Sequence, residues 1–200
     1  MLVLAAIVGY LFGTFPSADL VSRVATRGRV DLRRDGSGNP GGLNAMRQIG
    51  TGWGIVVVLA DLLKGTAGAF AGWAIGGTAG AYAAATTSMA GHIFPVWTGF
   101  RGGKGVATSA GACLAVFPAF FPIDAAVAAA GALGSRNPER TIWVNGFVWV
   151  STALIWWGFE LPNLWGPPPT LGLVMFSLLG TAMVVGKFRA AALAARRAGT

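Results

Sequence analysis

A glycine-rich segment at residues 35–47, DGSGNPGGLNAMR, has the composition of an anion-binding loop. Its backbone offers successive N–H groups that no side chain obstructs, a geometry that forms nests for anions. Arg47 closes the segment, and its guanidinium can clamp a phosphate through two parallel hydrogen bonds. The segment therefore predicts a phosphate-binding site.

A second glycine-rich segment, GHIFPVWTGFRGGKGVAT at residues 91–108, repeats this chemistry. Arg101 and Lys104 stand among glycines just before an apolar run that we expect to be a helix. The N-terminal amides of a helix favour an anion, so the two segments together suit two phosphates or one ligand with several anionic oxygens. The alternative is a pair of flexible turns whose cations contact lipid headgroups. A nucleotide-binding P-loop is a weaker match, because Gly105 occupies the position of the magnesium-binding Ser or Thr.

Three further ionisable residues lie in apolar stretches of the chain. His92 is the one histidine, and it suits either a general base or a structural residue at a helix interface. Asp61 and Lys64 are three residues apart and therefore lie on one helical face. Because ionised groups in an apolar span are costly unless they are paired, we expect a buried ion pair that supports the site. The single cysteine, Cys113, excludes a disulfide or a cysteine-based metal site within one chain, and we expect no metal.

The elements that position these residues are expected to be membrane-spanning helices. Hydrophobic residues make up 54% of the chain and charged residues 11%, with a mean hydropathy of +0.62, and these values do not suit a soluble surface. The net charge of +8 would fit a nucleic-acid partner, but a soluble fold would leave too many apolar residues in water. We predict an all-α integral membrane protein with about seven transmembrane helices. The expected spans, of which the fifth is short, are residues 2–22, 51–75, 78–97, 105–121, 122–134, 141–159 and 170–186.

The basic residues predict how these spans are oriented. Fourteen of the 15 Lys and Arg residues fall in four polar segments, at 23–48, 98–104, 135–140 and the tail after residue 186. A seven-span layout places all four segments on one side, and the opposite connections contain no Lys or Arg. By the positive-inside rule, the N-terminus lies outside and both glycine-rich loops lie on the cytoplasmic face.

Several of these segments resemble one family, the bacterial PlsY-type membrane acyltransferases, which acylate glycerol 3-phosphate with acyl phosphate. The resemblance covers roughly residues 9–111 and rests on GTFPSADLVSR, the GSGN loop with Asn44 and Arg47, DLLKG and the second glycine-rich segment. It implies a single polytopic membrane acyltransferase domain over residues 1–200, located in the bacterial plasma (inner) membrane. It also implies acyl phosphate and glycerol 3-phosphate as substrates, membrane lipids as partners, no nucleic acid and no cofactor; it says nothing of an oligomeric partner.

The reaction that the resemblance implies is attack of an acceptor hydroxyl on the carbonyl of a fatty acyl phosphate, which forms lysophosphatidic acid and releases phosphate. The donor is already an activated mixed anhydride, so the protein mainly holds two anions together and neutralises the departing charge. A nucleophilic serine is not expected, because no activating base lies near the GSGN loop in the sequence. The residues that the resemblance assigns to catalysis are Ser37, Arg47, His92 and Lys104, and those assigned to substrate or phosphate binding are Gly36, Gly38, Asn39, Asn44, Arg101, Gly102, Gly103 and Gly105.

The sequence departs from the family pattern in two places. Pro40, Gly42 and Leu43 stand where isoleucine, alanine and threonine are common, and the tail KFRAAALAARRAGT lacks the family's histidine, asparagine and terminal acid. The tail suits an interfacial basic helix instead. Three alternatives therefore stay open: a relative with an altered acceptor, a relative that binds lipid or phosphate without turnover, and a small-anion transporter. Only the charged residues Asp61 and Lys64 within a span favour transport.

Overall fold

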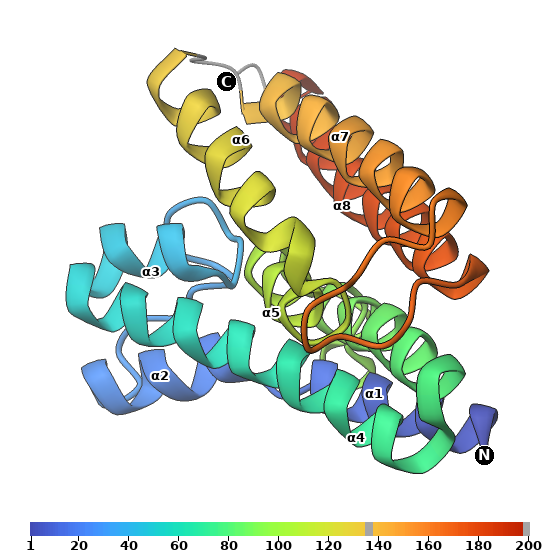
Figure 1. Ribbon diagram of the computed structural model, residues 1–200. Helices are drawn as coiled ribbons and strands as arrows, with labels where there is room; N and C mark the ends of the chain where they lie inside the picture. Colours follow the sequence, from blue (N-terminus) through green and yellow to red (C-terminus); the bar gives the residue numbers. More distant parts are fainter. Residues whose placement is uncertain (135–137, 198–200) are drawn as a thin grey trace.

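The computed structural model describes residues 1–134 and 138–197, and every regular element within these ranges is helical (Figure 1). The all-α prediction is therefore confirmed for the described residues, while Arg136, predicted in a basic segment, lies outside them. The α-helices are α1 (Leu2–Gly13), α2 (Ser17–Thr26), α3 (Gly42–Ile49), α4 (Thr51–Ile93), α5 (Val106–Val116), α6 (Phe121–Gly134), α7 (Pro138–Gly158) and α8 (Leu171–Arg197), with short 3₁₀ turns η1 (Val96–Thr98) and η2 (Pro118–Phe120).

The long element α4 is a helical hairpin. Its backbone leaves helical geometry at Gly76 and Gly77, and Gly77 has a φ of 60° that favours glycine. The two halves then pack closely, because a Cβ built on Gly72 would lie 2.1 Å from the Cβ of Ala84. Figure 1 shows α4 crossing the molecule and turning back beside α1. The break falls where the sequence separates two apolar segments, but the second half ends at Ile93 and not at residue 97.

Glycines let α1 lie directly against α4. A Cβ on Gly13 would come within 2.0 Å of the backbone oxygen of Ser88, and one on Gly91 within 2.2 Å of the backbone oxygen of Tyr10. Backbones that approach so closely gain van der Waals contact, which is the main source of helix association in lipid. The pair α1–α4 thus forms a fixed platform beside the second glycine-rich segment.

Two of the predicted spans are interrupted. The predicted helix over residues 2–22 is divided into α1 and α2, because Pro16 lacks a backbone N–H and restricts the residue before it. The predicted span 105–121 ends at Val116, and the chain then bends by 119° before continuing from Pro118. The eight-residue α3 was not predicted and lies within the first polar segment.

By length and composition, three helical segments in the described part of the chain qualify as membrane spans: Leu2–Thr26, Thr51–Thr98 and Leu171–Ala194. The bent pair formed by α5 and the start of α6 gives a fourth if it counts as one span. Seven transmembrane helices are therefore not confirmed. The second segment nevertheless contains the whole α4 hairpin. It is counted as one segment although it consists of two helices joined at Gly76 and Gly77.

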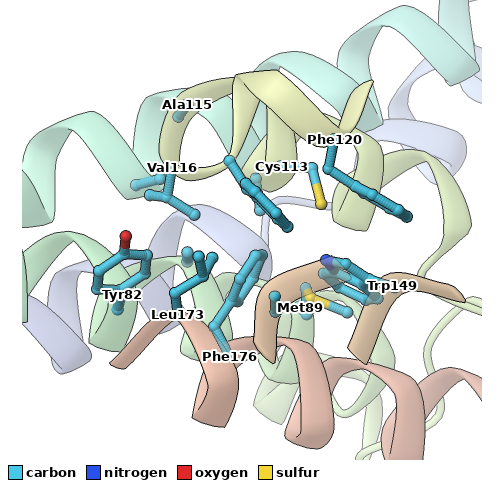
Figure 2. Packing of buried hydrophobic residues seen from close by; sticks show 14 of the residues in the cluster. Tyr82, Met89, Cys113, Ala115, Val116, Phe120, Trp149, Leu173 and Phe176 are labelled. Atoms are coloured by element: carbon cyan, nitrogen blue, oxygen red, sulfur yellow. The ribbon is translucent and has the colours of Figure 1, made fainter. Parts of the chain in front are cut away.

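The hydrophobic core joins the second half of α4 to α5, α7 and α8 (Figure 2). Trp149 of α7 belongs to this core, with its ring stacked on Phe120 at 6.1 Å and edge-on to Phe176 at 5.1 Å. Cys113 is buried in this cluster as a small core residue. The core holds the end of α8 beside the second glycine-rich segment.

Candidate active site

The first glycine-rich loop is shaped by the side chain of Asn44. Its amide nitrogen donates to the backbone oxygens of Leu32 and Asp35, both at 3.0 Å, and its oxygen accepts from the Ser37 N–H at 3.0 Å. Asn44 is buried and holds the loop through these hydrogen bonds, while its predicted role in phosphate binding stays a prediction. Gly36 has a φ of 63°, and a Cβ there would lie 2.4 Å from the Asn44 oxygen. A side chain at residue 36 would therefore break this arrangement.

The surface of the same loop remains accessible to a ligand. Gly36, Ser37 and Gly38 are exposed, and Asn39 is partly exposed. Arg47, near the end of α3, is also exposed and has no ion-pair partner among the described residues. The loop thus presents backbone, a hydroxyl and a guanidinium on an accessible face, although no hydrogen bond or ion pair joins Arg47 to the second loop among the described residues.

The second glycine-rich loop folds back onto His92. The N–H of Gly103 donates to the backbone oxygen of His92 at 3.2 Å, and the N–H of Gly102 donates to that of Ile93 at 3.0 Å. A Cβ on Gly103 would lie 2.3 Å from the His92 Nε2 atom. The N–H groups of Gly102 and Gly103 are therefore used within the loop in this structure, and the predicted role of these glycines in phosphate binding stays a prediction. Helix α5 begins after Gly105, and no side chain caps its N-terminus. Its first backbone N–H groups have no acceptor within the helix and so could bind an anion.

Arg33 joins the two loops, and sequence reasoning missed it. Its Nε atom lies 3.0 Å from one carboxylate oxygen of Asp19, and its second terminal nitrogen lies 2.8 Å from the other. The remaining terminal nitrogen donates to the backbone oxygen of Arg101 in the second loop. The loops also meet at Gly103, where a Cβ would lie 3.2 Å from the backbone oxygen of Pro40. Arg101 itself is exposed, so its contribution here is its carbonyl.

A buried ionic network lies beneath this junction. The Lys64 ammonium is 2.8 Å from the Asp61 carboxylate, and the Nδ1 atom of His92 is 3.4 Å from the same carboxylate oxygen. Ser17 donates its hydroxyl proton to Asp61, and Lys64 donates to the Ser17 hydroxyl at 3.1 Å and to the backbone oxygen of Phe15 at 3.0 Å. Each buried charge is thus paired and hydrogen-bonded, which offsets its desolvation cost. The pairing of Ser17 with this network was not foreseen.

A small pocket opens between the junction and the network. It is bounded by α1, α2, α4 and both loops, so chain segments distant in sequence form its walls. No group of three or more His, Cys, Asp or Glu side chains in the described residues could hold a metal ion. The charged or polar side chains that line the pocket are Thr14, Ser17, Asp19, Arg33, Asp61, Lys64 and His92.

The end of α8 contacts the second loop. The Lys104 ammonium lies 4.4 Å from the ring centre of Phe188, and the Lys187 ammonium lies 5.4 Å from that of Phe94. Partial burial lowers the pKa of Lys104 below its usual value of 10.5. The expected interfacial tail helix is instead the continuation of α8, which runs unbroken from Leu171 to Arg197. This continuation brings α8 side chains to the edge of the site.

Known proteins are similar to this chain in sequence and in the arrangement of their helices. The family model described as "Glycerol-3-phosphate acyltransferase" matches residues 3–195. A glycerol-3-phosphate acyltransferase of Rhodopseudomonas palustris (strain BisB5) is 36% identical over 172 residues, 86% of this chain and 85% of the relative. One of Rhizobium etli (strain CIAT 652) is 42% identical over 159 residues, 78% and 74% of the two chains. The crystal structure of PlsY, an integral membrane glycerol 3-phosphate acyltransferase, in its glycerol 3-phosphate form aligns with a TM-score of 0.75 and 26% identity, over 98% of this chain and 92% of that chain.

Proposed function

Because the chain belongs to the glycerol-3-phosphate acyltransferase family, we propose that it transfers a fatty acyl group from acyl phosphate to the hydroxyl of glycerol 3-phosphate. The acceptor oxygen forms an ester bond with the acyl carbon, the bond from that carbon to the phosphate oxygen breaks, and the hydroxyl proton leaves with the phosphate. The products are lysophosphatidic acid and inorganic phosphate. No covalent acyl-enzyme, metal or cofactor takes part in this scheme.

The convergence of two glycine-rich loops on one pocket is the observation that carries the proposal. Arg33 ties the loops together, and Lys104 stands on the second loop beside the start of α5. Both substrates are phosphates, so a site for them has to bring two anions together and offset their repulsion. Fixed cations and helix amides supply the positive potential for this task without a change in protonation.

We assign Ser37, Gly38, Asn39 and Arg47, on the accessible face of the first loop, and the partly buried Lys104 of the second loop to the phosphates. These residues lie outside the walls of the pocket between the loops. His92 acts as a positioning residue in this proposal. Its backbone oxygen accepts from Gly103, and its Nδ1 atom faces Asp61. The ring is therefore held between the ionic network and the second loop, where it fixes the position of that loop.

The proposal places the chain in the bacterial plasma membrane as one polytopic domain, with its N-terminus outside and both loops in the cytoplasm. The structure supports it by gathering basic residues from three separate segments around the site: Arg33, Lys104 and Lys187. The N-terminus lies at the α4 turn, where a Cβ on Gly76 would be 3.8 Å from Met1. Cytoplasmic loops would meet the water-soluble acceptor directly.

An altered acceptor is the second candidate function, and the end of α8 favours it. The family tail carries a histidine and an asparagine, whereas this chain brings Lys187 and Phe188 to the second loop. A cation at this position still suits a phosphorylated alcohol, but one of different size or polarity.

Phosphate release from palmitoyl phosphate tests both candidates. Purified protein without added metal should release phosphate only when an acceptor is present, and the lipid product identifies that acceptor. Release with glycerol 3-phosphate supports the main proposal, and release with another phosphorylated alcohol alone supports the second candidate. No release with any phosphorylated alcohol would favour a binding protein without turnover.

A further inference from the structure

Lys187 and Arg189 are the two basic residues within the candidate span Leu171–Ala194, and their side chains lie in different surroundings. Residues two apart on a helix point to nearly opposite faces. Arg189 is exposed and reaches outward, as a long cationic side chain near lipid headgroups does. Lys187 is partly buried and faces Phe94 of the second glycine-rich segment. Because a cation in an apolar span is costly without a partner, Lys187 marks a functional position.

The Lys187 ammonium has an aromatic ring beside it but no anion. It lies 5.4 Å from the ring centre of Phe94 and makes no hydrogen bond or ion pair with the described residues. An aromatic face attracts a cation without neutralising it, so the charge remains available to an anion. Phe94 is tied to α1, because its backbone oxygen accepts the Tyr10 hydroxyl at 2.7 Å. The ammonium is therefore held beside α1 and α4 before a ligand arrives.

The surroundings of Lys187 carry a surplus of positive charge. Lys187 lies close enough to Arg33 and His92 to interact electrostatically with both. The carboxylates beside those two residues, Asp19 and Asp61 respectively, are each already bound to a cation. No acid of the described residues is thus left to offset the charge of Lys187 at this end of α8. Like charges repel, so the arrangement favours a bound anion that offsets their repulsion.

We propose that Lys187 is a phosphate-binding residue of the acyl-transfer site, supplied by α8 where the family tail carries a histidine and an asparagine. The ligand class is a phosphate group with one substituent. The inference rests on the proposed function, in which the acceptor and the donor both carry such a group. The ammonium has three N–H donors, and its hydrogen bonds to phosphate oxygens are strengthened by the opposite charges.

Steady-state kinetics with palmitoyl phosphate and glycerol 3-phosphate tests this role. Lys187→Gln should raise the KM of one substrate about tenfold or more, as expected from the loss of one charge-assisted hydrogen bond, and Lys187→Arg should largely restore it. Arg189→Gln is the matched control, because it removes the same charge from the exposed face of α8. A rise confined to glycerol 3-phosphate assigns Lys187 to the acceptor, and a rise confined to palmitoyl phosphate assigns it to the donor. Unchanged KM values for both substrates would overturn the inference.

Thermal unfolding in detergent tests the same residue without turnover. Inorganic phosphate, compared with chloride at equal ionic strength, should raise the Tm of the wild-type protein and of Arg189→Gln. In Lys187→Gln this rise should be lost, while the Tm without phosphate stays unchanged. That result without acyl transfer in any of the proteins would support the phosphate site while rejecting the proposed activity. A lower Tm of Lys187→Gln without phosphate, together with a full phosphate-dependent rise, would show that Lys187 only holds α8 in place and would overturn the inference.

Discussion

Arg33 and Asp19 form a two-point ion pair that holds the first polar segment to the start of α2, and the third side of the same guanidinium contacts the second loop. The side chains are 24% and 30% exposed, so the pair is only partly screened by water. One residue thus connects α2, the first loop and the carbonyl of Arg101. Arg33 also lines the pocket between the loops.

Replacement of Arg33 by lysine should impair the site without unfolding the protein. Lysine keeps the charge but cannot bind Asp19 in two-point fashion and reach Arg101 as well. We expect kcat/KM to fall by the equivalent of about 1.5–3 kcal/mol, the range of hydrogen bonds to charged groups. Arg34→Lys is the matched control, because the Arg34 side chain is 87% exposed. Equal activity of the two variants would contradict the connecting role of Arg33.

The Asp61–Lys64 pair should show strong coupling in a double-mutant cycle. Lys64→Met alone leaves a buried carboxylate without its nearest cation and should cost about 3–5 kcal/mol of stability. Asp61→Leu combined with Lys64→Met removes both charges, so it should cost less than the sum of the single changes. Thermal unfolding in detergent measures the stability of the wild-type protein, the two single variants and the double variant. Additive losses would mean that the two charges do not depend on each other.

Gly103→Ala should disrupt the second loop. The new Cβ would lie 2.3 Å from the His92 Nε2 atom, and His92 is held on its other side by Asp61. We expect acceptor-dependent phosphate release to fall at least tenfold, about 1.4 kcal/mol in the barrier. Gly52→Ala is the control, since no atom lies within 4 Å of its Cβ position. Full activity of Gly103→Ala would contradict this prediction, because it would show that displacing His92 does not affect phosphate release.

Anion binding should weaken at high pH through Lys104. Burial lowers the pKa of this ammonium, so its charge is lost at a lower pH than that of an exposed lysine. Calorimetry with glycerol 3-phosphate across the alkaline range should show affinity falling as pH rises through this lowered pKa. In Lys104→Arg the fall should disappear, because a guanidinium stays charged. If the affinity fell in the same way in both proteins, the pH dependence would come from a titratable group other than Lys104.

Cysteine labelling tests the orientation of the chain. The native Cys113 is buried and should give little background. Arg34→Cys, beside the first loop, should react with a membrane-impermeant maleimide only after the inner face is exposed. Phe159→Cys, in the connection before α8, is 75% exposed in the native residue and should react in intact cells. Reaction of Arg34→Cys from outside would reverse the predicted topology.

The features that the sequence predicted well are local. The division at Gly76 and Gly77 follows from consecutive glycines between apolar runs, and the proximity of Asp61 and Lys64 follows from their helical spacing. The family resemblance located both loops, because their glycines are closely spaced along the chain.

The features that were missed depend on distant contacts. Arg33 meets a residue 14 positions away and another 68 positions away, and nothing in its own neighbourhood indicates either partner. The part that Asn44 plays in holding the first loop likewise depends on backbone oxygens that only the folded loop brings near. The bend after Val116 and the unbroken α8 likewise depend on how the core packs.

The unbroken α8 also sets the depth of the site in the membrane. Lys187 lies 16 residues beyond Leu171, a rise of about 24 Å along the helix, while the hydrocarbon layer is about 30 Å thick. With Leu171 at one boundary of that layer, Lys187 and Phe188 lie near the other, at the level where lipid headgroups begin. If the proposed acyl transfer takes place at this depth, the acyl chain of the product lies parallel to its neighbours in the leaflet, and the new lipid can leave sideways without crossing water.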